Sequence, residues 1–334
     1  MGKTYCIQGL LFELAKQGIS TVIFDYTDGF TEQKLDPIFT ESLNGKIEEQ
    51  YVKIDKFPIN PFSRHEIQIG SRTMLETDVD IANRLSSVFE TVYKFGAQQK
   101  SVIYEAIKSG FKEYKDNMSF IHMVEKIEES SNGSASTVLS KIMPFIDIDP
   151  FDSENSFSWG DIIDSKGKVY IIQLTGFDRA IQLMLTELIL WDIWNYCVKN
   201  GDESRPLPIV LDEAQNLSHK ADSPSGKILT EGRKFGIAGI YATQFLKGAL
   251  NDDEIQRLQQ SGQKLYFGPP ENSVMEIAKS IDINTQEAKE WAEKLKKLKK
   301  GECVTCGSMA KSDVLRKYDP KIIKVTSLGD RVNE

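Results

Sequence analysis

The chain has 334 residues, of which 40% are hydrophobic and 27% charged, and this composition is typical of a globular protein with one large domain or two smaller ones. Its formal net charge of −8 excludes a uniformly basic surface for nucleic acid, although a local basic stripe stays compatible with it. No apolar run approaches the roughly 20 residues that span a bilayer, and the first residues do not resemble a signal peptide. The four cysteines are too few for a disulfide scaffold, so these features together favour a cytoplasmic protein.

The first quarter of the chain alternates between helical and extended patterns. Residues 4–17 carry apolar side chains at helical spacing and end at a glycine, which predicts a helix. Residues 20–24 form a short β-branched run, which predicts a buried strand that ends at Asp25. A second short strand is predicted over residues 51–54, and the two prolines at 58 and 61 predict an extended loop.

The rest of the chain repeats this alternation after a long helical interruption. Strands are predicted at 168–174, 207–211, 237–243 and 264–267, and helices at 179–198, 273–281 and 285–298. Strands that alternate with helices predict βαβ units, hence an α/β fold with a mainly parallel sheet flanked by helices. We interpret residues 71–145 as an inserted helical subdomain between residues 1–70 and 146–334, which together form the core.

A phosphate-binding motif is suggested by the first residues. Gly2, Lys3 and Thr4 match the end of the P-loop pattern G-x-x-x-x-G-K-[ST], which follows a strand and opens a helix. Lys3 is expected to reach the β- and γ-phosphates of ATP, and the Thr4 hydroxyl to reach Mg²⁺. The earlier motif positions would precede residue 1, so we expect the 334-residue chain to bind ATP poorly and to hydrolyse very little of it. A chance Gly-Lys-Thr remains an alternative on this evidence alone.

Polar side chains follow two of the predicted strands. Asp212 and Glu213 come directly after residues 207–211. Asp212 is suited to hold the Mg²⁺ shell, and Glu213 to orient or deprotonate an attacking water. Gln244 follows the next strand, where it is expected to hydrogen-bond a γ-phosphate or its water, since parallel strands end at one edge of a sheet. Acids also cap many strands, but this combination downstream of Gly-Lys-Thr is more specific than either part.

An arginine lies between the acid pair and the glutamine. In a ring, Arg233 can reach the γ-phosphate held by the neighbouring subunit and stabilise charge in the transition state. A surface salt bridge with Glu231 or Asp222 is the alternative, and the sequence leaves both open.

Two cysteines near the carboxyl end have metal-binding spacing. Cys303 and Cys306 form a C-x-x-C pair, but no further pair at matching spacing follows. We interpret them as two strand residues in a hairpin rather than as a zinc site.

Taken in chain order, these segments resemble a known family. Gly-Lys-Thr, the strand that ends at Asp25, Asn-Pro-Phe at 60–62, Leu-Asp-Glu-Ala-Gln at 211–215, Glu-Gly-Arg-Lys-Phe-Gly at 231–236 and Ala-Thr-Gln at 242–244 are similar to motifs of the HerA/FtsK superfamily of ring ATPases. The resemblance is strongest to the HerA-type helicase–translocase branch, and it is weakest over residues 71–145.

The resemblance implies a RecA-like P-loop NTPase fold that uses ATP and Mg²⁺. It implies that Gly2, Lys3, Thr4 and Tyr5 end the Walker A loop, that Asp212 and Glu213 are the Walker B acids, that Gln244 is the sensor, and that Asp25 is the acid after the second core strand. It also implies a hexameric ring that moves double-stranded DNA, often beside a nuclease, in DNA processing or in defence against foreign DNA.

The sequence departs from the family at its start. The upstream Walker A residues and the amino-terminal β-barrel of HerA proteins are absent, so we expect Met1 to be an internal residue of a longer protein. Two alternatives stay open: a conjugation or secretion ATPase, and a non-catalytic remnant that only assembles with partners. A DNA-stimulated rate that needs no membrane partner would separate the first alternative from a HerA-type motor.

Overall fold

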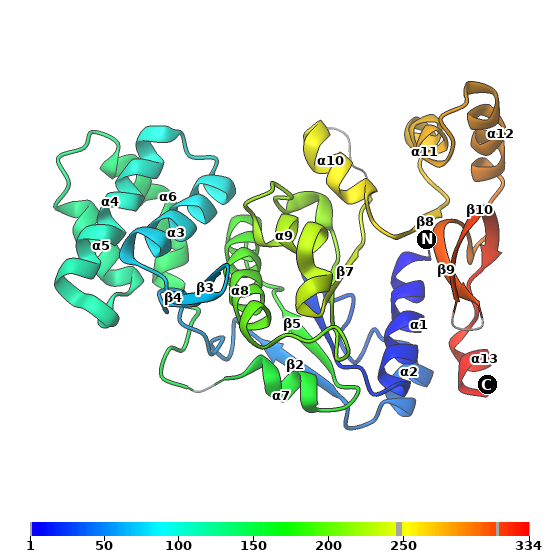
Figure 1. The fold of residues 1–334 in the computed structure, drawn as a ribbon, viewed down its shortest axis with the longest axis horizontal. Helices are drawn as coiled ribbons and strands as arrows, with labels where there is room; N and C mark the ends of the chain where they lie inside the picture. The colour runs from blue at the N-terminus through cyan, green and yellow to red at the C-terminus, as the bar shows by residue number, and fades with distance from the viewer. Residues whose placement is uncertain (1, 156, 245–248, 312–313, 334) are drawn as a thin grey trace.

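A computed structural model describes residues 2–155, 157–244, 249–311 and 314–333 of the chain. Its central feature is a five-stranded sheet in the order β2-β5-β1-β6-β7, in which every neighbouring pair is parallel (Figure 1). The strands are β1 (Thr21–Asp25), β2 (Ile47–Tyr51), β5 (Val169–Gln173), β6 (Leu207–Leu211) and β7 (Ile237–Tyr241). The predicted α/β fold with a mainly parallel sheet is therefore confirmed.

Helices cover both faces of this sheet because its central strands are apolar on both sides. Alternate residues of β1 point to opposite faces, so Val22 and Phe24 belong to one hydrophobic core and Ile23 to another. The first core includes side chains of α7 (Trp159–Asp164), α8 (Arg179–Asn200) and α9 (Pro224–Glu231). The second includes side chains of α1 (Lys3–Lys16) and α2 (Pro37–Ser42). The result is a three-layer arrangement.

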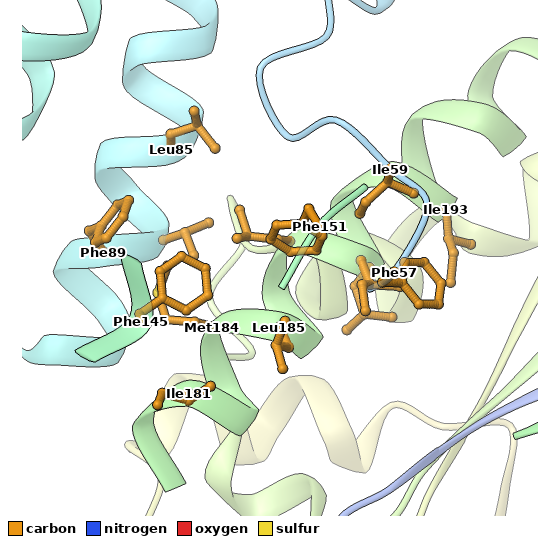
Figure 2. Close-up of a cluster of buried hydrophobic side chains, with 14 of the residues drawn as sticks. Phe57, Ile59, Leu85, Phe89, Phe145, Phe151, Ile181, Met184, Leu185 and Ile193 are labelled. Atoms are coloured by element: carbon orange, nitrogen blue, oxygen red, sulfur yellow. The ribbon is translucent and has the colours of Figure 1, made fainter. Parts of the chain in front are cut away.

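Four helices between β2 and β5 gather at one end of the molecule (Figure 1). They are α3 (Asp78–Tyr93), α4 (Ala97–Tyr114), α5 (Phe120–Glu128) and α6 (Ala135–Ile148). Figure 2 shows Leu85 and Phe89 of α3 and Phe145 of α6 beside Met184 and Leu185 of α8, all within one buried cluster. The helices thus share their core with the sheet. The division of the chain at residues 70 and 145 stays a prediction.

A buried ion pair attaches α3 to the preceding extended loop. The Arg84 guanidinium donates to both carboxylate oxygens of Glu76, at 3.0 and 2.9 Å, and to the carbonyl oxygens of Pro61 and Ser63, each at 3.1 Å. The Arg84 and Glu76 side chains are only 6% and 8% exposed. Five donors in a fixed geometry allow one arginine to hold the carboxylate and the loop together.

A second, smaller sheet lies at the opposite end of the molecule (Figure 1). Its antiparallel strands are β8 (Gln263–Phe267), β9 (Glu302–Lys311) and β10 (Val314–Lys324). It packs with α11 (Val274–Ile281) and α12 (Thr285–Lys296) around a separate small core. The strand expected at 264–267 is therefore present, but it belongs to this sheet. Cys303 and Cys306 lie in β9, paired with β8 and β10 as the hairpin interpretation expected.

Two local predictions were wrong. The strand expected at 51–54 is instead β2, shifted four residues toward the amino end, where its polar Ile-Glu-Glu-Gln-Tyr sequence suits an edge strand with one neighbour. The start of the expected helical region is instead β4 (Arg72–Leu75), which forms a hairpin with β3 (Glu66–Ile69) just before that region. Gly70 turns this hairpin with φ 61°, a conformation that favours glycine.

The chain returns to its first helix near its carboxyl end. The helix α13 (Leu328–Asn333) lies beside α1 and α2. The Leu328 N–H donates to the Tyr5 hydroxyl at 2.9 Å, and Arg331 forms an ion pair with Glu13 at 2.9 Å. The remaining helix, α10 (Asp252–Gln259), precedes β8, and short 3-10 turns cover Lys115–Asn117, Ala214–Asn216, Gly232–Phe235 and Glu271–Ser273. No helix among the described residues is long and apolar enough to span a bilayer.

Candidate active site

The predicted site residues meet where three neighbouring strands end. The strands β1, β6 and β7 are parallel and adjacent, so Asp25, the pair Asp212 and Glu213, and Gln244 all follow the same edge of the sheet. Lys3 reaches this edge from the first turn of α1, and its Nζ donates to the Thr243 carbonyl oxygen at 2.7 Å. Side chains separated by about 240 positions in sequence are thereby brought together.

Charges of both signs share this edge. Burial lowers the pKa of the Lys3 ammonium, while the Asp212 and Glu213 carboxylates act in the opposite direction. Burial raises the pKa of Asp212, and the neighbouring Glu213 and Asp25 carboxylates act in the same direction. Asp25, Asp212 and Glu213 thus outnumber Lys3 at this edge of the sheet. A bound cation would offset this excess of negative charge.

Glu213 is held in an unusual backbone conformation. Its φ of 51° and ψ of 34° lie in the left-handed region, which a residue with a Cβ adopts at a cost of about 1 kcal/mol. The Glu213 N–H donates to the Asp212 carboxylate at 2.9 Å, and its carbonyl oxygen accepts from the Asn216 side chain at 3.0 Å. The Glu213 carboxylate accepts from the amide groups of Gln215 and Gln244. The acid is therefore fixed through both its main chain and its side chain.

Asp25 uses its carboxylate to hold the turn after β1. One oxygen accepts from the N–H groups of Thr27 and Gly29, each at 3.1 Å, and the other from Phe30 N–H at 2.8 Å and Gln173 Nε2 at 2.9 Å. The side chain is almost fully buried. These four donors fix the Asp25 carboxylate against the turn at the edge of the sheet, and its expected place among the cofactor-binding residues stays a prediction.

The remaining residues of the expected phosphate loop start α1. Gly2 has φ 150°, and its carbonyl oxygen accepts the first helical hydrogen bond from Cys6 N–H at 2.9 Å. Thr4 is exposed on the first turn. The Tyr5 hydroxyl accepts from Leu328, which directs Tyr5 toward α13. Met1 lies outside the described residues.

Arg233 lies apart from the acids. It sits on the Gly232–Phe235 turn, its side chain is 92% exposed, and Glu203 pairs with it at 3.5 Å. The sequence suggested Glu231 or Asp222 as surface partners, and neither is the one observed. Within one copy of the chain, Arg233 is therefore free of the site and oriented to solvent.

A histidine that the sequence did not single out links the acid loop to two helices. The buried His219 ring bonds the Ala214 carbonyl oxygen through Nε2 and the Ser225 hydroxyl of α9 through Nδ1, both at 2.7 Å. Its main-chain N–H donates to Glu254 of α10 at 2.9 Å. Burial lowers the pKa of His219, which favours the neutral ring, and Nε2 carries its proton because the Ala214 carbonyl oxygen can only accept. An isolated histidine in a polar stretch carries no sequence signal for such a role.

The donor set suits Mg²⁺ with a nucleotide. Carboxylate and hydroxyl oxygens, as at Asp212 and Thr4, are the hard ligands that Mg²⁺ prefers, and such sites complete their shells with water and phosphate oxygens. Among the described residues, no group of three or more His, Cys, Asp or Glu side chains could hold a metal unaided. Asp212 fits a Mg²⁺ site that is completed by water and nucleotide oxygens. Burial disfavours the charged form of its carboxylate, and a bound divalent cation would stabilise that form.

The parallel sheet, the lysine at the start of α1 and the acids at the strand ends define an α/β fold of the P-loop NTPase class. Residues 1–193 match the family described as Helicase HerA, central domain, and the chain belongs to that family. The DNA double-strand break repair helicase HerA of Sulfolobus acidocaldarius is 24% identical over 330 residues, which cover 95% of this chain and 62% of the relative. The helicase HerA of Sulfurisphaera tokodaii is 25% identical over 337 residues, with the same coverage. The chain thus spans less than two thirds of these relatives.

Solved structures share the fold at lower identity. The bacterial conjugative coupling protein TrwB, in complex with sulphate, superposes with a TM-score of 0.56 at 14% identity, covering 99% of this chain and 77% of that one. Plasmid coupling protein TrwB in complex with ADP and Mg²⁺ gives a TM-score of 0.54 at 12% identity, covering 94% and 86%. The predicted resemblance to the HerA/FtsK superfamily is confirmed by the family match.

Proposed function

We propose that this chain is an ATPase motor that uses ATP and Mg²⁺ to move along double-stranded DNA. The observation that carries the proposal is the meeting of Lys3, Asp212, Glu213 and Gln244 at one edge of the sheet, with Lys3 bonded to the main chain just before Gln244. The names of the relatives, which are DNA double-strand break repair helicases, support the choice of DNA.

Each residue has a role in this proposal. Lys3 binds the β- and γ-phosphates, and Thr4 and Asp212 hold Mg²⁺, which when bound neutralises developing charge on the phosphates. Glu213 orients the attacking water and accepts its proton, while Gln244 senses the γ-phosphate. Gly2, Tyr5 and Asp25 complete the proposed set of nucleotide-binding residues.

The assembly that we propose is a homo-oligomeric ring, with six subunits as the family resemblance implies. The 92% exposure of the Arg233 side chain, whose observed ion pair is with Glu203, supports a role across a subunit boundary. A nuclease partner, a cytoplasmic location and a role in DNA processing or in defence against foreign DNA belong to the same proposal.

ATP turnover by the purified protein with its natural termini tests the proposal. We expect hydrolysis that linear double-stranded DNA stimulates and that Glu213→Gln reduces to a small residual rate while nucleotide binding remains. A hydrolysis rate that DNA leaves unchanged but that a membrane partner raises would favour a conjugation-type ATPase. The fold likeness to TrwB does not support that alternative more strongly than the HerA-type motor. A turnover equal in wild type and Glu213→Gln would remove the motor proposal.

A further inference from the structure

A buried glutamine lies two residues after the proposed catalytic acid. Gln215 belongs to the 3-10 turn Ala214–Asn216, and it is only 2% exposed. A primary amide that is removed from water must find partners for both of its ends, since an unpaired buried polar group is destabilising. The hydrogen-bond partners of Gln215 therefore indicate which groups it holds in place.

Both ends of this amide bond groups of the site. Its Nε2 donates to Glu213 Oε2 at 2.5 Å, and its Oε1 accepts from the Gln244 main-chain N–H at 3.3 Å. A carboxylate only accepts and a main-chain N–H only donates, so a flipped amide would face two repulsive contacts. Gln215 therefore has a single orientation, and it bridges the ends of β6 and β7.

The main chain beneath this bridge is fixed as well. Ala214 N–H donates to the Ala242 carbonyl oxygen, and Ala242 N–H to the Leu211 carbonyl oxygen, both at 2.9 Å. These bonds extend the pairing of β6 and β7 past the acid pair. The turn that carries Gln215 is thus hydrogen-bonded to the segment that follows β7.

The second amide on Glu213 differs in its surroundings. Gln244 donates to Glu213 Oε1, but its side chain is exposed at the edge of the site. An exposed side chain can leave the carboxylate at little cost, whereas a buried one with two bonds cannot. One oxygen of Glu213 is therefore held by the buried Gln215, and the other by the exposed Gln244.

We propose that Gln215 is a positioning residue for ATP hydrolysis, an inference that rests on the function proposed above. Gln215 holds Oε2, so Oε1 points to the water once Gln244 turns to the γ-phosphate. Water attacks the γ-phosphorus, its proton passes to Oε1, and the bond to the ADP oxygen breaks to give ADP and inorganic phosphate. Gln215 touches none of the reacting atoms and acts through Glu213.

Steady-state kinetics of Gln215→Leu, made in the protein with its natural termini, test this inference. Leucine keeps the approximate volume but removes both hydrogen bonds. We expect kcat to fall on the order of 10–100-fold, as for other residues that orient a reacting group, with KM and the affinity for a fluorescent ATP analogue within about threefold of wild type. Gln215→Asn, which retracts the amide by one methylene, should lower kcat likewise in a folded protein if leucine prevents folding.

A double mutant separates positioning from a merely structural effect. In a Glu213→Gln background, Gln215→Leu should cause no further fall in the residual rate, because residues that act as a unit are not additive. Gln182→Leu is the matched control: this buried amide donates to the Tyr26 and Leu174 carbonyl oxygens at 3.1 and 2.9 Å and not to Glu213, so its loss should lower stability with kcat unchanged.

The outcomes distinguish this inference from the function on which it rests. Wild-type kcat in Gln215→Leu, or an equal loss in both backgrounds, would overturn the positioning role while the motor proposal stands. Equal turnover in wild type and Glu213→Gln would overturn both.

Discussion

The Lys3 ammonium and the Thr243 carbonyl oxygen lie 2.7 Å apart, although 240 positions separate them in the chain. This bond ties the first turn of α1 to the end of β7, beside the amide that contacts Glu213. In the proposed function Lys3 can exchange this main-chain carbonyl for a phosphate oxygen, with a gain in charge interaction.

Replacing Lys3 should affect nucleotide binding far more than stability. We expect Lys3→Met to weaken the binding of a fluorescent ATP analogue by about 10–100-fold, because a charge-assisted bond to phosphate is lost. The free energy of unfolding should change by about 1 kcal/mol, the net value of one hydrogen bond. Lys300→Met, at an exposed position of the same charge, is the control. Unchanged affinity in Lys3→Met would place the phosphates elsewhere.

Arg233 should act on a neighbouring subunit. Arg233→Ala and Glu213→Gln are each expected to lack DNA-stimulated hydrolysis. An equimolar mixture should regain about a quarter of the wild-type rate, because one boundary in four then joins an intact Glu213 to an intact Arg233. Lys234→Ala, next to it on the same exposed turn, should keep its activity. A mixture that stays inactive would return Arg233 to a surface ion pair.

Glu187 should make the fold less stable in alkali. Burial in α8 raises its pKa from 4.5 to about 8, so the folded chain keeps a proton that the unfolded chain releases between these values. Stability from this group is complete below pH 4.5 and is lost as the pH rises through 8. Glu187→Gln should therefore be more stable than wild type by about 3–5 kcal/mol at pH 9 and nearly equal at pH 5.

Urea unfolding at the two pH values measures this difference. Glu128→Gln, at an exposed position on α5, should show no such dependence. A parallel loss of stability by wild type and Glu187→Gln between pH 5 and pH 9 would contradict the assignment.

Breaking the buried pair of Arg84 and Glu76 should be costly. Arg84→Met leaves the Glu76 carboxylate buried and removes the bonds to the extended loop, so we expect a loss of about 3–5 kcal/mol in the free energy of unfolding. Arg205→Met is the matched control, because Arg205 and Asp164 are 58% and 66% exposed, and exposed pairs contribute about 0–1 kcal/mol. Similar losses in both variants, measured by denaturant unfolding, would show that burial does not decide the effect.

The central strands and long helices could be predicted from the sequence because a single physical signal dominates them. The strand β6 occupies the predicted residues 207–211, since five consecutive apolar residues suit only a strand buried on both faces. The helix α8 begins at Arg179 as predicted. The edge strand β2 was misplaced because it has one neighbour and a polar sequence, so no hydrophobic pattern marks it.

The candidate site could be predicted as a set of strand ends, but not in its details. Parallel strands bring Asp212, Glu213 and Gln244 to one edge wherever the loops lead, so their meeting follows from topology. The burial of Gln215 depends on a 3-10 turn and on the left-handed conformation of Glu213, which no local pattern announces. The direction of Arg233 depends likewise on a short turn, and its relation to another subunit stays a prediction.

The bond between Tyr5 and Leu328 has a consequence for synthesis on the ribosome. The two residues are 323 positions apart, so at about 5–20 residues per second the first helix emerges tens of seconds before α13 can cover it. During that interval the face of α1 that receives Arg331 is open to water and to chaperones. The helix that carries Lys3 therefore acquires these contacts only after the residues of α13 have left the ribosome.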